Sequence, residues 1–469
     1  MAATQQHKEL SKKLKFWYGF GDFGFTLMTN VETFYFNAFM TNVAGFSTAL
    51  AGTVSTIAST IDACLSWIYG GLINTLKPGK WGRYRSWLVM LTWLVPFLFI
   101  FQFLNVSSNQ TVSAVVICVA AVVSHIVWNM PYAANATVVA MAGGTPEGRA
   151  ALASSRGTWN NLAGVLFSYA VPLVEVIIGQ KMVESGKLYA ACAFLFGIVM
   201  VAGYFVHFKI TDGYEAPEDP NAPKAARTTP ADMGRALFGN KHLLLLVLAD
   251  LAKWIVKFLV ASAAVYYFTY AMGTKLQATY VLIANLMGVA GAFAARFIAK
   301  KFTNRGAILI AYAWMAILMI ISYICFKSPV LVLVRMCAAQ FGYGVCYACS
   351  PALYADTAVY AQWKSAENKD SKGFIMGLQT VPLKVAVMIK SIVLNLALGL
   401  AGYDAYRAGI ADKSITADML PDSLKQGVCG AFSLWSGIFL IVGFCILFFG
   451  YKLTKEKVDE YQAEIDARG

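Results

Sequence analysis

Residues 111–131 read TVSAVVICVAAVVSHIVWNMP and contain no Asp, Glu, Lys or Arg. About 20 apolar residues are enough for a helix to cross the hydrocarbon core of a bilayer. Eleven further apolar runs flank this one, and together with their loops they fill most of the 469 residues. We therefore predict an all-α membrane protein with twelve transmembrane helices, near residues 16–41, 46–73, 86–104, 111–141, 155–179, 187–208, 242–272, 277–299, 305–326, 329–361, 373–401 and 429–452.

The composition supports a membrane protein. Hydrophobic residues make up 58% of the chain and charged residues 13%, whereas soluble proteins contain about 25% charged residues. The net charge of +13 does not indicate nucleic-acid binding, because the basic residues lie at the ends of apolar runs and form no continuous stripe. We expect the partners to be the lipid bilayer and a small-molecule substrate, with no nucleic acid.

The loops alternate in charge. The outward loops after spans 1 and 3 contain no Lys or Arg, and no cleavable signal peptide is visible in the polar, basic first fifteen residues. Lys and Arg accumulate in cytoplasmic loops of membrane proteins, so the pattern predicts that both termini are cytoplasmic. The basic loops follow spans 2, 4, 8 and 10 and contain Lys77, Lys80, Arg83, Arg85, Arg149, Arg156, Lys300, Lys301, Arg305, Lys364, Lys369 and Lys372.

The chain divides into two predicted six-span halves, residues 1–210 and 241–469, the second ending in a cytoplasmic tail. The proline-containing, charged segment 211–240 is typical of a cytoplasmic linker. Parallel repeats of six spans place a substrate site near the midplane, between the halves. Two triplets with the same spacing suggest such a repeat: Pro131, Thr137 and Val139 in span 4, and Pro351, Thr357 and Val359 in span 10.

Ionisable residues inside the spans are the functional candidates, because charges are costly in a bilayer. Asp62 lies in the middle of span 2, where a carboxylate can bind and release a proton. Lys384 lies early in span 11, and a Lys384–Asp62 pair is our hypothesis for a charge network that links the halves; the alternative is a purely structural ion pair. The other candidates are Asp22, Glu32, Glu175, Asp250, Asp356, Lys253, Lys257, Arg335, Lys390, Arg156 and His125.

Helical spacing places several polar residues on common faces. His125 and Asn129 share one face of span 4, which suggests hydrogen bonding to a substrate, or packing alone. Asp250, Lys253 and Lys257 share one face of span 7. We expect a local Asp250–Lys253 pair, while Lys257 either faces the cavity or reaches a carboxylate on another span; we favour the second.

The sequence contains no HExxH, P-loop or GxSxG motif, so an enzyme is not expected. Its only CxxC, Cys346–Cys349, lies in an apolar run with no second pair, which indicates buried side chains and no metal site. Among the many aromatic residues, Tyr347 and Trp128 are the ones we expect to stack on a substrate. We expect neither a cofactor nor a bound metal.

Four short stretches, in order, carry a family resemblance: GFGDFG at 19–24, KWGRYRSW at 80–87, ADTAVYAQWK at 355–364 and QTVPLK at 379–384. They resemble the glycoside–pentoside–hexuronide:cation symporters, the melibiose-carrier-like family of the major facilitator superfamily. The resemblance covers about residues 15–455. It implies a major facilitator fold with two pseudo-symmetric six-helix halves, alternating access, a bacterial inner membrane and a monomer.

The family's cation site matches in part. Asp62 retains the first carboxylate, but Ser66 stands at the position of the second, and Ile126 stands at the position of a hydroxyl. Sodium prefers several oxygen ligands, so we expect proton coupling through Asp62, with His125 as a second group, in preference to sodium coupling.

The resemblance implies substrate-binding positions at Arg156, Tyr347, Gln379, Thr380 and Lys384. The family's acidic sugar-site positions are occupied here by Thr26 and Asn129. The cavity therefore gains positive charge relative to the family pattern. Charges at the cytoplasmic ends of spans 2 and 10 are interpreted as gating residues that change partners between conformations: Arg83, Arg85, Asp356 and Lys364.

These residues predict a secondary active transporter that imports a sugar-like solute. The positive balance favours an anionic glycoside, a hexuronide or a sulfonated sugar, with proton coupling. Two alternatives stay open. One is a facilitator with no obligatory ion, and the other is a transporter of amphiphilic organic acids or lipids on the same fold.

Overall fold

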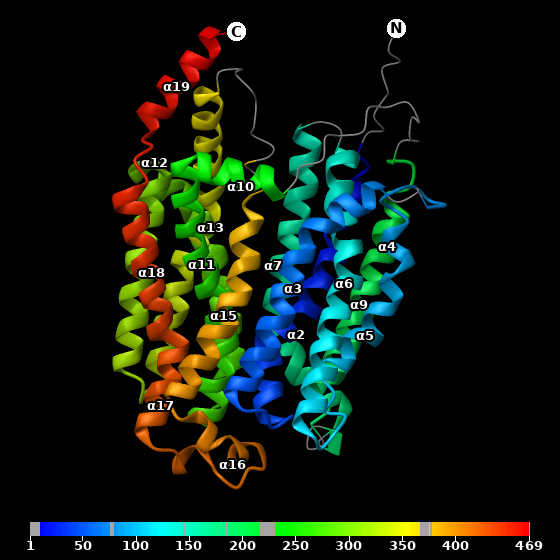
Figure 1. The fold of residues 1–469 in the computed structure, drawn as a ribbon, viewed down its shortest axis with the longest axis vertical. Helices are drawn as coiled ribbons and strands as arrows, with labels where there is room; N and C mark the ends of the chain where they lie inside the picture. Colours follow the sequence, from blue (N-terminus) through cyan, green and yellow to red (C-terminus); the bar gives the residue numbers. More distant parts are fainter. Residues whose placement is uncertain are drawn as a thin grey trace. The chain divides into compact units, whose positions relative to one another are not determined.

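The structure, a computed structural model, describes residues 10–75, 79–143, 146–179, 181–182, 186–215, 230–365, 375 and 378–468. Within these ranges the chain is helical, with no β-strand and a single isolated bridge between Gly79 and Gly82 (Figure 1). The residues group into two compact units. Unit 1 comprises Met1–Phe46 and Ile57–Arg227, and unit 2 comprises Ser47–Thr56 and Thr228–Gly469.

Unit 1 is built from helices that lie side by side (Figure 1). Helix α2 packs against α7 and α9, and α6 packs against α5 and α7. The helices are α1 (Lys12–Trp17), α2 (Phe20–Asn42), α3 (Thr48–Thr75), α4 (Trp87–Met90), the short η1 (Thr92–Leu94), α5 (Val95–Phe101), α6 (Gln110–Gly143), α7 (Pro146–Ile178) and α9 (Leu188–Ile210). The first turns of α3, up to Thr56, belong to unit 2.

Unit 2 contains the remaining helices. Helix α11 packs against α13, α15 and α18, and α12 packs along α13. They are α10 (Pro230–Gly239), α11 (Lys241–Val265) with η2 (Tyr266–Ala271), α12 (Leu276–Ile324), α13 (Pro329–Lys364), α15 (Thr380–Leu400), η3 (Tyr403–Ala405), α16 (Arg407–Ala411), η4 (Ala417–Met419), α17 (Asp422–Cys429), η5 (Gly430–Leu434), α18 (Trp435–Cys445), η6 (Ile446–Gly450) and α19 (Lys455–Arg468).

Eight helices of the described part are long and apolar enough to cross a membrane. One of them, α12, contains two predicted spans, because the backbone of Thr303 leaves the helical region with φ 64° and ψ 166°. The Thr303 hydroxyl accepts a hydrogen bond from the Gly306 amide and so begins the second segment. Helices α2 and α11 are also long enough to cross a membrane, but they carry the polar residues discussed below. The segment Trp87–Phe101 is apolar but shorter.

One predicted span starts later than the helix that it overlaps. Helix α7 begins at Pro146, nine residues before the predicted 155–179 span, so Arg149 and Arg156 lie in a helix and not in a loop. Proline is favoured in the first turn of a helix, and the alanines that follow favour its extension. Helix α10 lies within the segment 211–240, residues 216–229 of that segment lie outside the described ranges, and its role as a linker stays a prediction.

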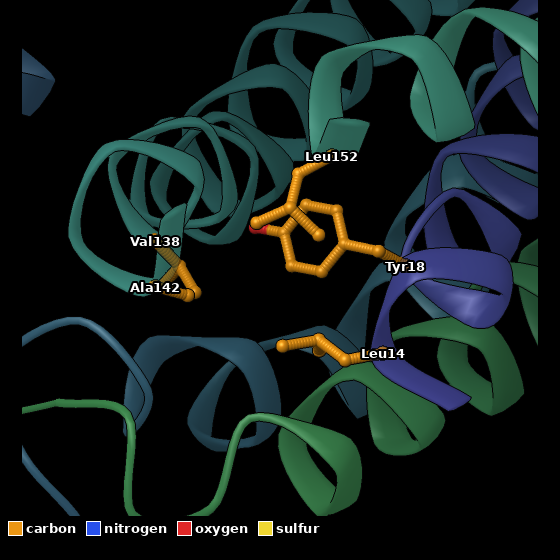
Figure 2. Packing of buried hydrophobic residues seen from close by; sticks show 5 residues of the cluster. All are labelled: Leu14, Tyr18, Val138, Ala142 and Leu152. Carbon is orange, nitrogen blue, oxygen red and sulfur yellow. The ribbon is translucent and has the colours of Figure 1, made fainter. Parts of the chain in front are cut away.

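Local packing explains how the helices come close. In unit 1 the buried ring of Tyr18 lies between Leu14 and Leu152 and points toward α6, where its hydroxyl donates to the Asn135 carbonyl at 2.8 Å (Figure 2). In unit 2, α12 and α13 meet through glycines. A Cβ atom on Gly344 would lie 1.9 Å from the carbonyl oxygen of Gly288, so any larger residue would push the two helices apart.

Candidate functional site

Four polar side chains from three helices meet in unit 1. The Nε2 atom of His125 lies 2.9 Å from a carboxylate oxygen of Glu32, and its Nδ1 atom lies 3.8 Å from Asp62 Oδ1. The Asn129 amide donates to the same Asp62 oxygen at 2.6 Å. We call Glu32, Asp62, His125 and Asn129 the carboxylate–imidazole cluster.

The helices fix this geometry. His125 and Asn129 occupy one face of α6, and the Asn129 amide also donates to the His125 carbonyl at 2.8 Å. The ring of Trp128 contacts the imidazole edge-on, with ring centres 5.2 Å apart, and it packs against Phe25 of α2. The imidazole is therefore held on both its polar and its apolar sides, between carboxylates from α2 and α3.

The cluster has two carboxylates and one imidazole. When His125 is neutral and donates from Nε2 to Glu32, its Nδ1 carries a lone pair that faces the oxygen of Asp62. At 3.8 Å the two atoms are too far apart for a hydrogen bond, and a proton added to either group would remove the repulsion between them. Proton binding at this cluster stays a prediction.

A second polar network in unit 1 surrounds Asp22, which is 1% exposed. The Arg156 guanidinium donates to both its oxygens, at 2.8 and 2.7 Å, and the Asn135 amide donates to them at 3.2 and 3.3 Å. His207 accepts from the Gly21 amide at Nε2 and lies 3.0 Å from Asn135 through Nδ1. The Gly21 donor requires an unprotonated Nε2, so the proton of a neutral His207 is on Nδ1.

This network bears on two predicted substrate residues. Arg156, which was predicted to bind substrate, uses two of its donors on Asp22. The hydroxyl of Thr26 donates to the Asn160 side chain at 2.7 Å, which joins α2 to α7. Their contact with a substrate stays a prediction. The ring of Trp128 is buried beside His125.

In unit 2, one carboxylate organises a polar group between α11 and α13. Asp250 Oδ1 lies 2.5 Å from the Lys253 ammonium and accepts from the Ser350 hydroxyl at 2.9 Å. Its second oxygen accepts from the Trp254 indole at 3.1 Å. The expected Asp250–Lys253 pair is thus present, and Lys253 is 2% exposed.

The predicted reach of Lys257 to a carboxylate on another span stays a prediction. The Lys257 ammonium lies 4.8 Å from the ring centre of Tyr343 and 5.7 Å from that of Trp254, and it makes no ion pair with a described residue. Tyr347, 56% exposed, completes a group of rings with Trp254 and Tyr343. We call Trp254, Lys257, Tyr343 and Tyr347 the lysine–aromatic surface.

The remaining substrate and coupling candidates lie at the start of α15 or outside the described side chains. Gln379 precedes the helix and is half-buried, Thr380 is exposed at its first position, and Lys384 follows one turn later. Asp62 belongs to unit 1 and Lys384 to unit 2, so the Lys384–Asp62 pair stays a prediction. The side chain of Ser66 is outside the described part.

Three of the four predicted gating residues bind within their own unit. Arg83 donates to the Ile73 carbonyl near the end of α3. Arg85 binds the end of α9 through the Phe208 carbonyl at 2.9 Å and through Asp212 at 2.8 Å. Lys364 donates to the Gly239 carbonyl of α10 at 3.1 Å, and Asp356 has no ion-pair partner among the described residues. A change of partners between conformations stays a prediction.

Sequence reasoning missed two features of these sites. Glu32 was counted among the buried acids but was given no role, although it is the direct partner of His125. The Trp254 ring was also overlooked. The spacing of Asp250, Trp254 and Lys257 on adjacent turns was the available signal, but orientation of the indole by the carboxylate required coordinates.

Comparisons with known proteins agree with this architecture. The family model described as "MFS/sugar transport protein" matches residues 17–455. The chain is 25% identical to the "Glucuronide carrier protein homolog" of Escherichia coli (strain K12), over 98% of this chain and 97% of that protein. It is 22% identical to the "Isoprimeverose transporter" of Lactiplantibacillus pentosus, over 87% and 85%. The fold is similar to the crystal structure of a D-xylose-proton symporter, with a TM-score of 0.66, 13% identity and coverage of 96% and 99%.

Proposed function

Since the chain belongs to the MFS/sugar transport family, we propose that it imports an anionic sugar-like solute, of the glucuronide type, together with a proton. The transporter is a multi-pass membrane protein and not an enzyme. We place it in a bacterial inner membrane as a monomer that works by alternating access. The basic loops support cytoplasmic termini.

The observation that carries proton coupling is the carboxylate–imidazole cluster. His125 lies 2.9 Å from Glu32 and 3.8 Å from Asp62. Imidazole is the side chain that changes charge near neutral pH, and here its two nitrogens face two carboxylates. One bound proton relieves the repulsion at Asp62, so loading and release of a proton changes the charge inside unit 1.

The same contacts favour a proton over sodium. A sodium ion requires several oxygen ligands directed at one point. Asp62 Oδ1 instead accepts from the nitrogen of Asn129 and faces a ring nitrogen, and the Glu32 carboxylate faces the other ring nitrogen. Nitrogen atoms occupy these positions around the carboxylates and leave few oxygen atoms for a metal ion.

The anionic substrate is supported by charge and by relatives. Lys257 and Lys384 place ammonium groups on helices α11 and α15. One similar protein is named a glucuronide carrier homolog, and a glucuronide carries a carboxylate. Another is named an isoprimeverose transporter, and isoprimeverose is uncharged. The ammonium groups favour the first class of solute for this chain.

Uptake into membrane vesicles that contain the protein tests the proposal. An inward proton gradient in sodium-free buffer is expected to drive accumulation of para-nitrophenyl β-D-glucuronide, and a protonophore is expected to abolish it. Accumulation that requires sodium and ignores the proton gradient would refute proton coupling. Equilibration without accumulation would identify a facilitator. Transport of amphiphilic acids or lipids, with none of the glucuronide, would refute the sugar-like substrate.

A further inference from the structure

Lys257 is a charge that helix α11 of unit 2 places in a predicted membrane span with no ion-pair partner among the described residues. It lies at the middle of the continuous helical stretch formed by α11 and η2, from Lys241 to Ala271. Its side chain is exposed and makes no hydrogen bond or ion pair with a described residue. An ammonium at this depth is strongly disfavoured against lipid, so it must face water or a ligand.

The neighbouring acid is not available to neutralise it. Asp250 lies two turns earlier on the same helix, but its oxygens accept from Lys253, Ser350 and Trp254. The Lys253 ammonium, 2.5 Å from Asp250 Oδ1, already neutralises the charge of Asp250. Among the described residues, the ammonium of Lys257 lies beside the electron-rich faces of two aromatic rings, which compensate a cation in part.

The rings are held in place and partly accessible. The indole of Trp254 is fixed through its Nε1 atom on Asp250 at 3.1 Å. Tyr343 and Tyr347, one turn apart on α13, lie with ring centres 6.3 Å from each other and from the Trp254 ring. Tyr347 is 56% exposed. Flat rings beside a cation suit a ligand that has both an apolar ring face and a negative charge.

We propose that the lysine–aromatic surface is the subsite for the acidic group of the solute: Lys257 pairs with a carboxylate or sulfonate, and Trp254, Tyr343 and Tyr347 pack against the sugar ring. This inference deepens the proposed function and rests on it for the sugar-like substrate. It does not depend on which ion drives transport. Lys257 is then a specificity-determining residue that selects acidic sugars over neutral ones.

The test compares two matched ligands on purified full-length protein by isothermal titration calorimetry: para-nitrophenyl β-D-glucuronide and para-nitrophenyl β-D-glucoside. The variant Lys257→Gln is expected to lose about tenfold or more in affinity for the glucuronide, with little change for the glucoside, because the charge pair with the acidic group is removed. Lys257→Arg retains the charge and is expected to stay within a few-fold of the wild type. Tyr347→Leu should lower the affinity for both ligands to the same extent.

Controls separate this inference from the proposed function. Lys327→Gln removes an exposed lysine of the same unit, 70% accessible and paired with Asp422, and is expected to change neither affinity. An unchanged glucuronide-to-glucoside affinity ratio in a folded Lys257→Gln protein would overturn the role of Lys257 while leaving the substrate class intact. A wild type that binds neither ligand would overturn the proposed substrate class, and the subsite with it. Thermal unfolding of each variant establishes that it is folded.

Discussion

In unit 1, the carboxylates of Glu32 and Asp62 flank one imidazole, whereas in unit 2 the ammonium groups of Lys253 and Lys257 share a helix face with one carboxylate, Asp250. The first arrangement has an excess of acid and attracts a proton. The second has an excess of base and attracts an anion. The difference suggests a division of labour, in which one unit handles the coupling ion and the other recognises the charge of the solute.

The largest expected effect comes from Asp62→Asn, which removes the charge that faces His125. The variant can no longer take up the shared proton, so accumulation of a glucuronide in a proton gradient should fall to equilibration, while exchange of internal for external substrate continues. Vesicle uptake and counterflow assays measure the two activities. Full accumulation by this variant would break the assignment of coupling to unit 1.

Asp250→Asn is expected to be the most destabilising change in unit 2. It leaves the Lys253 ammonium, 2% exposed, without its carboxylate, and loss of one member of a buried ion pair costs about 3–5 kcal/mol. Thermal unfolding in detergent should show a clear decrease in midpoint. Ser350→Ala removes only a hydroxyl contact and serves as the matched control with a smaller decrease.

Asp22→Asn makes the corresponding change in unit 1, where Arg156 loses its bidentate partner. We expect a smaller decrease in stability than for Asp250→Asn, because Arg156 is partly accessible (18%) and water can compensate its charge. Thermal unfolding compares the two variants directly. An equal or larger decrease would show that accessibility of the cation is not what separates the two networks.

Glu32→Gln is expected to weaken coupling without abolishing it. Glutamine retains a hydrogen-bond acceptor for His125 but removes one of its two carboxylate neighbours, so the cluster keeps only one negative charge to attract the coupling proton. Accumulation in a proton gradient should fall a few-fold, as measured by vesicle uptake. Accumulation equal to that of the wild type would place Glu32 outside the coupling step.

The smallest expected effect on proton coupling comes from a change in unit 2. Lys257→Gln should weaken binding of a glucuronide but leave the number of protons carried with each substrate molecule unchanged, since the carboxylate–imidazole cluster is intact. Simultaneous recording of substrate entry and proton entry gives this ratio. A changed ratio would mean that the two units do not act separately.

Much of the fold follows from the sequence because apolar length is a strong signal. Each predicted span overlaps helices of the described part, and the Thr303 break separates the two spans that form α12. The family resemblance and the transport function are confirmed by the family match. The start of α7 was missed because Arg149 and Arg156 resembled a basic loop, whereas Arg156 lies inside the bundle on Asp22.

The candidate site was less predictable, because partner choice depends on how helices rotate about their axes. Asp62, His125 and Asn129 were each singled out, and they lie together. The fourth member, Glu32, shares no sequence pattern with them, since three helices must pack before it meets His125. For Lys257, spacing identified the helix face, but only coordinates distinguish a ring partner from an acid.

The most direct test of the division of labour is proton movement during substrate entry. In proteoliposomes with equal pH on both sides, no sodium, and potassium with valinomycin to clamp the voltage, adding para-nitrophenyl β-D-glucuronide should raise the external pH for the wild type. The Asp62→Asn variant should admit the glucuronide with no such rise. An equal rise in external pH per molecule of glucuronide in the two proteins would contradict the account.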